Sequence, residues 1–242
     1  MSLRRVFTEE PLRSGTLVSL RDDAANHVVR VLRLRRGDEL IVFDGSGVDY
    51  DGRIADLSRD QVRVELGAGR EIRSESNLDI VLLQGICRGA RMDTVVQKAT
   101  ELGAKRIEPL LTQRSVVRLD EGQGTRKTGH WQRIAIAAAE QSGRSRITEV
   151  AEPQSFEVAV AATVGMPTRL LLDPAGTSLR ELPPPATPLA LLVGPEGGLT
   201  DAERDLAITA GFAAVRLGPR ILRTETAPIA ALAVLQFLAG DF

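Results

Sequence analysis

The sequence predicts a two-domain α/β protein, with a small β-barrel over residues 1–72 and a parallel-sheet domain over residues 73–242. Three observations carry this prediction. In the first part, apolar residues recur at about every second position in short segments that glycine and aspartate separate. In the second part, apolar runs alternate with segments of helical periodicity, as in a mainly parallel sheet covered by helices. Between the two, residues 69–77 are polar and indicate a linker.

The first part contains four predicted strands and one predicted helix. The strands cover residues 15–20, 39–44, 50–57 and 61–66. Strands this short and this closely spaced favour a barrel. Asp22 or Asp23 is the expected N-cap of the helix. The apolar stripe of that helix consists of Ala25, Val28, Val29 and Leu32.

The second part begins with a continuous apolar run over residues 78–86, which has the composition of a buried parallel strand. A helix is predicted over residues 92–102, where apolar residues share one face and Gly103 ends the pattern. Further strands are predicted at residues 107–111, 169–172, 189–193 and 214–217. Further helices are predicted at residues 130–142, from residue 201, and at residues 228–239, with a proline-rich loop at residues 183–188.

Composition excludes several classes of protein. The 242 residues include 31 Lys and Arg against 32 Asp and Glu, so positive charge for a nucleic acid must be gathered locally. Aromatic residues make up 3%, too few for a single-strand binder built on stacking. The single cysteine, Cys87, cannot form an internal disulfide, which fits a reducing compartment. His27 and His130 lack neighbours with the spacing of metal ligands, so no metal is expected.

Neither a secretory leader nor a membrane span is predicted. Residues 1–7 lack the apolar core of a signal peptide. No stretch reaches the roughly 18 uninterrupted apolar residues of a membrane-spanning helix. We therefore expect a cytoplasmic protein.

Two glycine-rich turns near the C-terminus are the strongest candidates for a binding site. They cover residues 193–199 and 217–227, and each follows an apolar run and precedes a helical segment. Ligands of α/β sheets bind at the C-terminal ends of strands, where such turns lie. Thr200 and Glu203 form a predicted capping box after the first turn. A turn without a ligand is the alternative for the first segment alone, and neither standard phosphate-binding glycine motif is present.

Charged residues in the second turn favour a function over a purely structural role. Thr224 or Thr226 as N-cap, with Glu225 against the helix dipole, would be a structural explanation. That explanation accounts poorly for Arg223, because a cation is electrostatically misplaced at a helix N-terminus. Arg223 is therefore a candidate functional residue.

Two arginine clusters are candidates for phosphate contacts. Arg144 and Arg146 follow a predicted helix, where cations also favour the helix dipole, so a structural role explains them well. The other cluster comprises Arg30, Arg33, Arg35 and Arg36. Its four charges on one helix and turn suit either a solvated face or a phosphate-binding patch.

Taken together, these segments resemble the RsmE family, the methyltransferases that modify N3 of a uridine in small-subunit ribosomal RNA. The resemblance covers nearly the whole chain. Its most specific motifs are Gly-Pro-Glu-Gly-Gly at residues 194–198 and Ile-Leu-Arg-Thr-Glu-Thr-Ala at residues 221–227. Supporting segments are His27, residues 31–33, Gly37, residues 92–93, residues 97–103, Pro109, residues 114–115 and residues 140–144.

The resemblance implies a PUA-like RNA-binding β-barrel followed by a SPOUT methyltransferase domain. In such a domain the C-terminal part, about residues 190–242 here, forms a trefoil knot, an exception to the usual avoidance of knots. S-adenosylmethionine (SAM) would bind in a bent conformation in the knot and leave as S-adenosylhomocysteine. The implied partners are 16S ribosomal RNA, within the assembled small subunit, and a second copy of the chain that completes the site.

The same resemblance assigns roles to individual residues. The expected cofactor-binding residues are Leu172, Gly194, Glu196, Gly197, Leu217, Gly218, Ile221, Leu222, Thr224 and Ala227. The expected RNA-binding residues are Arg5, His27, Arg30, Arg33, Arg91, Arg114 and Arg144. For catalysis, Arg223 would stabilise the anion that develops when N3 loses its proton, and Glu225 or Glu196 would accept that proton.

Two other functions stay open on the residues alone. One is a different methylation, for example at the ribose 2′-hydroxyl. The other is a non-catalytic RNA-binding protein with a vestigial knot. The charged second turn favours a catalyst over the non-catalytic alternative.

Overall fold

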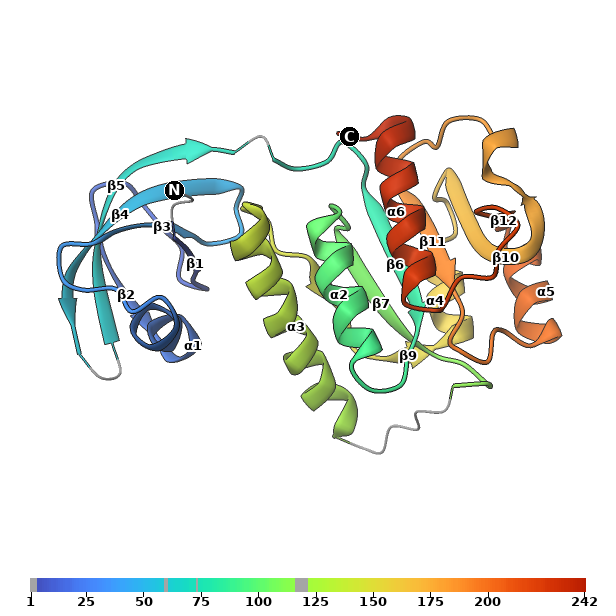
Figure 1. Ribbon diagram of the computed structural model, residues 1–242, viewed down its shortest axis with the longest axis horizontal. Coiled ribbons are helices and arrows are strands. Elements are labelled where there is room, and N and C mark those ends of the chain that lie inside the picture. The colour runs from blue at the N-terminus through green and yellow to red at the C-terminus, as the bar shows by residue number, and fades with distance from the viewer. Residues whose placement is uncertain (1–3, 59–60, 73, 116–121) are drawn as a thin grey trace. The chain divides into compact units, whose positions relative to one another are not determined.

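The computed structural model describes residues 4–58, 61–72, 74–115 and 122–242 (Figure 1). Its contacts divide the chain into two compact units. The first comprises Met1–Glu75 and Ala139–Ile147, and the second comprises Ser76–Ala138 and Thr148–Phe242. The predicted boundary between residues 72 and 73 falls at a residue outside the described ranges.

The first unit contains a five-stranded sheet in the order β1-β3-β4-β5-β2. Its strands are β1 (Arg5–Phe7), β2 (Leu17–Arg21), β3 (Glu39–Phe43), β4 (Val48–Leu57) and β5 (Gln61–Glu71). Neighbouring strands are antiparallel, except that β1 runs parallel to β3. Alternate residues of β5, such as Val62 and Val64, are fully buried, while their neighbours face outward. The sheet curls visibly around this core (Figure 1).

Two features of this sheet correct the sequence prediction. Strand β1 was not predicted, because three residues are too few to show a periodic pattern. Strand β5 continues through Gly69 to Glu71, in the segment predicted as linker, because these residues pair with β4. A Cβ on Gly69 would lie 2.8 Å from the ring of Tyr50, so the close strand contact at this position requires glycine.

The predicted helix of the first unit is present as α1 (Asp22–Asn26) followed by a single π-helical turn, η1 (His27–Val31). Ala25 and Val28 are buried against the sheet, as predicted. The predicted aspartate cap is wrong: Arg21 is the N-cap, it makes no side-chain capping bond, and Asp22 and Asp23 lie in the first turn. Carboxylates in that turn favour the helix dipole instead.

The second unit is built on a seven-stranded sheet whose main path has the order β12-β10-β11-β6-β7-β8, with β9 also paired to β7. All of its strand pairs are parallel, as predicted. The strands are β6 (Ile80–Gly85), β7 (Arg106–Leu111), β8 (Glu149–Val150), β9 (Gln154–Ser155), β10 (Thr168–Ser178), β11 (Leu189–Val193) and β12 (Ala213–Arg216).

Helices cover both faces of this sheet. They are α2 (Arg91–Glu101), α3 (Gln123–Ser142), α4 (Phe156–Ala162), α5 (Asp201–Thr209) and α6 (Thr226–Ala239), with a 3-10 turn, η2, at Leu179–Glu181. Side chains of α2, α3 and α6 belong to one apolar cluster, and those of α4 and α5 belong to another. Strand β6 contributes Leu82 to the first cluster and Leu83 to the second, because successive side chains point to opposite faces.

The structure adds elements that the periodicity did not predict. Helix α4 is short, but Ser155 caps it by accepting a hydrogen bond from the backbone N–H of Val158. Serine is a common N-cap residue, so Ser155 could have indicated the start of this helix in the sequence. Helix α3 begins at Gln123 rather than at residue 130, and β10 extends to Ser178 after an irregularity in its pairing with β12. Strands β8 and β9 have two residues each, too few for a sequence pattern.

Candidate functional site

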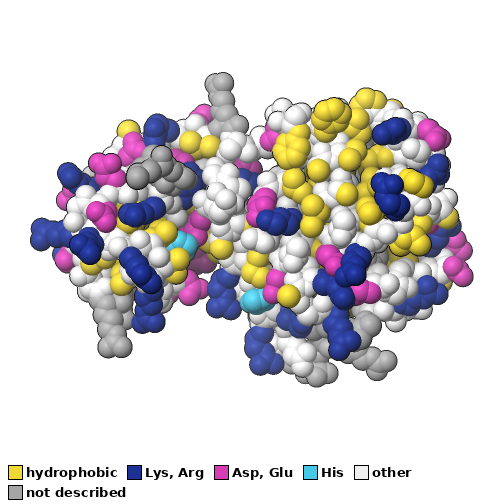
Figure 2. Space-filling view, in the orientation of Figure 1, with side chains coloured by type: hydrophobic (Ala, Val, Ile, Leu, Met, Phe, Trp, Pro, Cys, Tyr) yellow, Lys and Arg dark blue, Asp and Glu magenta, His cyan; other side chains and the backbone are white. Residues whose placement is uncertain are grey.

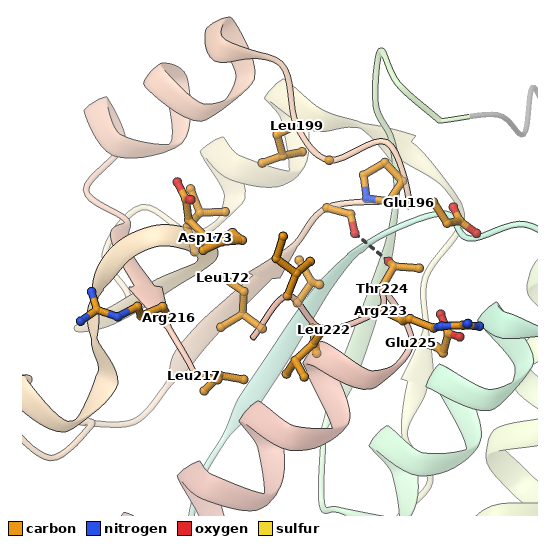
Figure 3. A pocket seen from close by; sticks show the side chains of 18 of the residues that line it. Leu172, Asp173, Glu196, Leu199, Arg216, Leu217, Leu222, Arg223, Thr224 and Glu225 are labelled. Carbon is orange, nitrogen blue, oxygen red and sulfur yellow. Dashed lines mark hydrogen bonds between the residues drawn. The ribbon is translucent and has the colours of Figure 1, made fainter. Parts of the chain in front are cut away.

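The two glycine turns lie at the same edge of the sheet in the second unit. The first turn follows β11 and the second follows β12, and β10 lies between those two strands. Because all three strands are parallel, their C-terminal ends meet at one edge. A cavity of about 680 Å³ opens there, lined by both turns and by residues 171–174 in the middle of β10 (Figure 3).

The cavity contains most of the residues expected at a cofactor site. Nine of the ten expected residues line it: Leu172, Gly194, Glu196, Leu217, Gly218, Ile221, Leu222, Thr224 and Ala227. The tenth, Gly197, contacts Arg114 instead, since a Cβ on this glycine would lie 3.1 Å from the Cβ of that arginine. Leucine side chains line the middle of the cavity, and charged residues line two of its sides (Figure 3). This combination suits an apolar ligand body with polar ends.

Thr224 ties the two turns together. Its hydroxyl donates a hydrogen bond of 2.8 Å to the carbonyl of Gly194 in the first turn (Figure 3). The side chain is turned inward, and the residue is 9% exposed. The N-cap of α6 is Glu225, which makes no side-chain capping bond. The structural alternative, in which Thr224 or Thr226 caps the helix, is therefore wrong.

Arg223 lines the cavity as a cation without a protein partner. Its side chain makes no hydrogen bond or ion pair with the residues that the structure describes, and the residue is exposed. It lies one turn before α6, with only Thr224 and Glu225 between it and the helix (Figure 3). An unpaired guanidinium at a cavity wall is available to an anionic or electron-rich ligand.

The carboxylates of Glu196 and Glu225 meet at Arg91. The Arg91 guanidinium donates to Glu196 Oε1 over 2.8 Å, and its Nε lies 3.7 Å from Glu225 Oε1. Glu196 Oε1 also accepts the backbone N–H of Arg88 over 2.9 Å. Partial burial raises the pKa of the Glu196 carboxyl, but these hydrogen bonds outweigh it and hold that pKa below its usual value. Arg91, expected to bind RNA, thus connects the two turns.

The predicted capping box is confirmed, and it supports the first turn. Thr200 accepts the backbone N–H of Glu203, and Glu203 Oε2 accepts the backbone N–H of Thr200. The other oxygen of this buried carboxylate accepts the N–H of Gln113 over 2.8 Å. Next to it, Arg114 donates to the carbonyl of Leu199 over 3.0 Å. Two loops are thereby held against each other at the edge of the cavity.

Sequence reasoning assigned no role to four charged residues that line the cavity. They are Asp173, Arg204, Arg216 and Arg220. Asp173 Oδ2 accepts a hydrogen bond of 2.6 Å from Arg204 Nε. Burial raises the pKa of the Asp173 carboxyl, but this bond and the N–H of Ala175 hold it below its usual value. Asp173 directly follows the predicted strand at residues 169–172, so its position at the strand end was a usable signal.

Cys87 is unsuited to act as a nucleophile. Burial raises the pKa of its thiol to about 11, so the thiolate is scarce near neutral pH. The residue is 2% exposed and lies just after β6. Cys87 is therefore a poor candidate for a covalent adduct.

The remaining arginines expected to bind RNA have two kinds of surroundings. Arg30 and Arg33 are exposed on and just after η1, and several basic side chains gather on the visible face of the first unit (Figure 2). Arg5 pairs with Asp49, and its side chain is 11% exposed. Arg144 is 5% exposed and donates to Glu75 over 2.7 Å. A phosphate would reach these two only by displacing a carboxylate.

His27 also pairs inside the first unit. Its Nδ1 lies 3.4 Å from Glu140 Oε2, and Glu140 Oε1 accepts the backbone N–H of Phe7. Burial raises the pKa of the Glu140 carboxyl, and the Phe7 N–H and His27 only partly offset that effect. Glu140 and Arg144 thus attach the segment at residues 139–147 to the rest of the first unit.

The described residues contain neither a metal site nor a membrane-spanning helix. Within the described ranges, no three His, Cys, Asp or Glu side chains gather in an arrangement that could hold a metal ion. Across the same ranges, no helix has the length and apolar character needed to cross a membrane.

Comparisons with known proteins cover both parts of the chain. A family model of the RNA methyltransferase domain matches residues 74–236, and one of the RNA methyltransferase PUA domain matches residues 20–67. Ribosomal RNA small subunit methyltransferase E of Synechocystis is 36% identical, over 98% of this chain and 78% of that protein. The Bacillus subtilis protein of the same name is 29% identical, over 97% of each chain.

Solved structures give the same result. Ribosomal RNA small subunit methyltransferase E from Neisseria gonorrhoeae, bound to SAM, has 37% identity and a TM-score of 0.91 over 99% of each chain. A Legionella pneumophila structure in complex with SAM has 37% identity and a TM-score of 0.96 over the full length of both chains. The two domain matches and these full-length similarities show that the chain belongs to the ribosomal RNA small subunit methyltransferase E family, which are RNA methyltransferases.

Proposed function

We propose that this protein uses SAM to methylate N3 of a uridine in 16S ribosomal RNA, acting on the small subunit in the cytoplasm. The observation that carries the proposal is the unpaired Arg223 at a cavity formed by two glycine turns. Family membership supports the cofactor and the class of substrate. Under this proposal, residues 1–72 form a PUA-like RNA-binding domain. Residues 73–242 form a SPOUT domain with a trefoil knot at about residues 190–242.

The cavity fits SAM in volume and in chemistry. About 680 Å³ lies within the range of small-molecule sites, and the walls combine apolar side chains with charged ones. Leu172, Leu217 and Leu222 would contact the adenine, and backbone groups of both turns would read its edge. Bound SAM would supply an electrophilic methyl group. The protein must therefore hold the uridine in line with that methyl and remove one proton.

The charged residues beside Arg223 suit removal of the N3 proton. The guanidinium of Arg223 would stabilise the negative charge that develops on the uracil ring. Glu225 is the better proton acceptor, because its carboxylate accepts no hydrogen bond from the described residues, and its ion pair with Arg91 is long, at 3.7 Å. Glu196 is engaged by two hydrogen bonds that lower its pKa, so it is the weaker base. We assign Glu196 to holding the first turn.

Nucleoside mass spectrometry tests the chemistry directly. Small subunits from cells that lack the enzyme are incubated with the purified protein and SAM, and the 16S RNA is digested to nucleosides. We expect one new 3-methyluridine per subunit. A 2′-O-methylated nucleoside would replace the N3 assignment with ribose methylation. No SAM binding in calorimetry would favour a non-catalytic RNA-binding protein.

RNA binding is proposed for the exposed arginines of the first unit. Arg33 has a φ of 52°, in the left-handed region, so Arg33→Gly removes the charge and also relieves backbone strain. We expect Arg30→Ala combined with Arg33→Gly to weaken RNA binding. The slope of log affinity against log salt should fall by about 1.4 to 1.8 if each contacts one phosphate. Filter binding at several salt concentrations measures this.

The matched control removes two other arginines of the same unit. Arg63 and Arg70 are exposed but pair with Asp56 and Asp51. The variant Arg63→Ala combined with Arg70→Ala loses the same formal charge, and we expect its salt slope to match the unmodified protein. Equal slopes in both double variants would remove Arg30 and Arg33 from the RNA interface.

A homodimer is proposed through the outer face of α6. This face leaves apolar side chains in water, with Phe237 73% exposed and Leu238 47% exposed. Figure 2 shows the apolar side chains gathered over α6. A contiguous exposed patch of this kind is typical of a protein interface. The second copy would lie against the C-terminal end of α6, where Phe237 and Leu238 are located.

Phe237→Glu tests this interface. The charge would have to be buried unpaired in the dimer, so we expect a monomer in sedimentation velocity at micromolar concentration. Val158 on α4 is 58% exposed and supplies the control Val158→Glu, which should stay dimeric. A dimer that survives Phe237→Glu would place the interface elsewhere.

A further inference from the structure

We propose that Gln84, at the end of β6, is a positioning residue that holds the two cofactor turns in register through Thr224. Gln84 does not line the cavity, and it is fully buried. The inference rests on the proposed function, because it concerns the site that would bind SAM.

The contacts of Gln84 form a chain from β6 to both turns. Its side-chain Nε2 donates to the carbonyl of Gly85 over 3.0 Å, to Thr224 Oγ1 over 3.4 Å and to Cys87 Sγ over 3.5 Å. Thr224 in turn donates its own proton to the carbonyl of Gly194 over 2.8 Å. A hydroxyl has one proton to give, so the bond to Gly194 leaves its lone pairs for Gln84. Gln84 in β6 thus donates to Thr224 in the second turn, and Thr224 donates to Gly194 in the first.

The other end of the Gln84 amide argues against a role in core packing. Its Oε1 is buried without a hydrogen-bond partner among the described residues. A buried oxygen without a partner costs stability, whereas a methionine would fill the same space without that cost. The neighbours Leu82, Leu83 and Ile86 are all apolar and fully buried. The amide therefore acts here through its N–H group. Among the acceptors of that group, Thr224 is the one that lies in a cofactor turn.

Gly85, the next residue, supports the first turn by direct contact. A Cβ at this position would lie 2.5 Å from the backbone nitrogen of Pro195. The backbone of β6 therefore touches the first turn, while the side chain before it reaches the second. Two consecutive residues of one strand thus hold both walls of the cavity at a defined spacing.

Gln84→Met isolates the positioning role. The substitution keeps the volume and removes the N–H group, so we expect SAM affinity to fall roughly tenfold in calorimetry, the scale of one net hydrogen bond. The melting temperature should stay the same or rise, because the unpaired Oε1 is also removed. Amide hydrogen exchange in the ligand-free protein should be faster in residues 217–227.

A double-mutant cycle connects the effect to Thr224. Thr224→Val removes the acceptor, so Gln84→Met should cost nothing further in that background. Thr224→Ser keeps the hydroxyl acceptor, so Gln84→Met should still lower SAM affinity about tenfold in that background. The control is Gln236→Met on α6. Gln236 is another buried glutamine, and it bonds Ser76 and the carbonyl of Leu102 outside the cavity. It should alter stability but not SAM affinity.

The results separate this inference from the proposed function. Unchanged exchange in residues 217–227 of Gln84→Met would overturn the positioning role, as would fully additive losses in the cycle. Absence of SAM binding by the unmodified protein would instead overturn the proposed cofactor. The exchange measurement would still decide the role of Gln84, because it needs no ligand.

Discussion

Arg223→Ala is expected to lower the rate of RNA methylation by about 10² to 10³-fold while the protein stays folded. The expected size is that of removing one preorganised group that stabilises charge in the transition state. The guanidinium has no partner among the described residues, so its loss breaks no ion pair that the fold needs. Single-turnover kinetics with small subunits and excess SAM measures the rate without a contribution from product release.

The affinity for SAM and the dependence on pH make this prediction specific. SAM affinity in calorimetry should change less than threefold, since Arg223 is assigned to the uracil anion. Raising the pH should partly restore the rate of Arg223→Ala, because the N3 proton then leaves without stabilisation by the cation. Arg180 is exposed on η2, outside the cavity, and Arg180→Ala should be fully active. Near-normal turnover of Arg223→Ala would remove Arg223 from the mechanism.

Gly85→Ala is expected to damage both the fold and the cavity. A Cβ there would lie 2.5 Å from the backbone nitrogen of Pro195, a separation that real Cβ atoms essentially never show. The neighbour is backbone, so the clash is relieved only by moving the first turn away from β6. We expect the free energy of unfolding to fall by about 2 to 3 kcal/mol, as for other overpacked cores. SAM affinity should fall at least tenfold.

The control for this variant is the same substitution in a helix. Gly129 lies within α3, and a Cβ there would meet nothing within 4 Å. Gly129→Ala should therefore raise the free energy of unfolding by about 0.5 to 1 kcal/mol, the helical advantage of alanine over glycine. Urea unfolding measures both variants. If Gly85→Ala were as stable as the unmodified protein and bound SAM equally well, the contact between β6 and the first turn would not be required.

Periodicity in the sequence predicted the long elements well, because each buries a continuous apolar face. Residues 92–102 and 189–193 are examples, and they correspond to α2 and β11. Periodicity failed where hydrogen bonds to a distant strand decide the conformation. Strand β1 and the last residues of β5 owe their structure to pairing with β3 and β4, and nothing in their own side chains shows it.

The candidate site, like the fold, was predictable where it depends on local motifs and not where it depends on contacts between distant residues. The motif residues of both turns could be identified, and their position at the strand ends followed from the alternation of strands and helices. The partners of individual side chains could not be identified. Arg5 and Arg144 look in the sequence like any other surface cations, yet both pair with carboxylates close to them only in the fold. Asp173 could have been identified from its position directly after a predicted strand, although it belongs to no motif.

The parallel sheet of the second unit, the two turns and the unusual cation Arg223 before a helix could all be predicted from the residues alone. These depend on local pattern and on chemistry within a few residues. Three contacts became visible only in the folded chain: Thr224 donates to Gly194, Arg91 meets both candidate carboxylates, and Gln84 donates to Thr224. The physical reason is that these contacts join residues about 30 to 140 positions apart. A hydrogen bond across such a separation depends on how strands are ordered in the sheet, and no local pattern encodes that order.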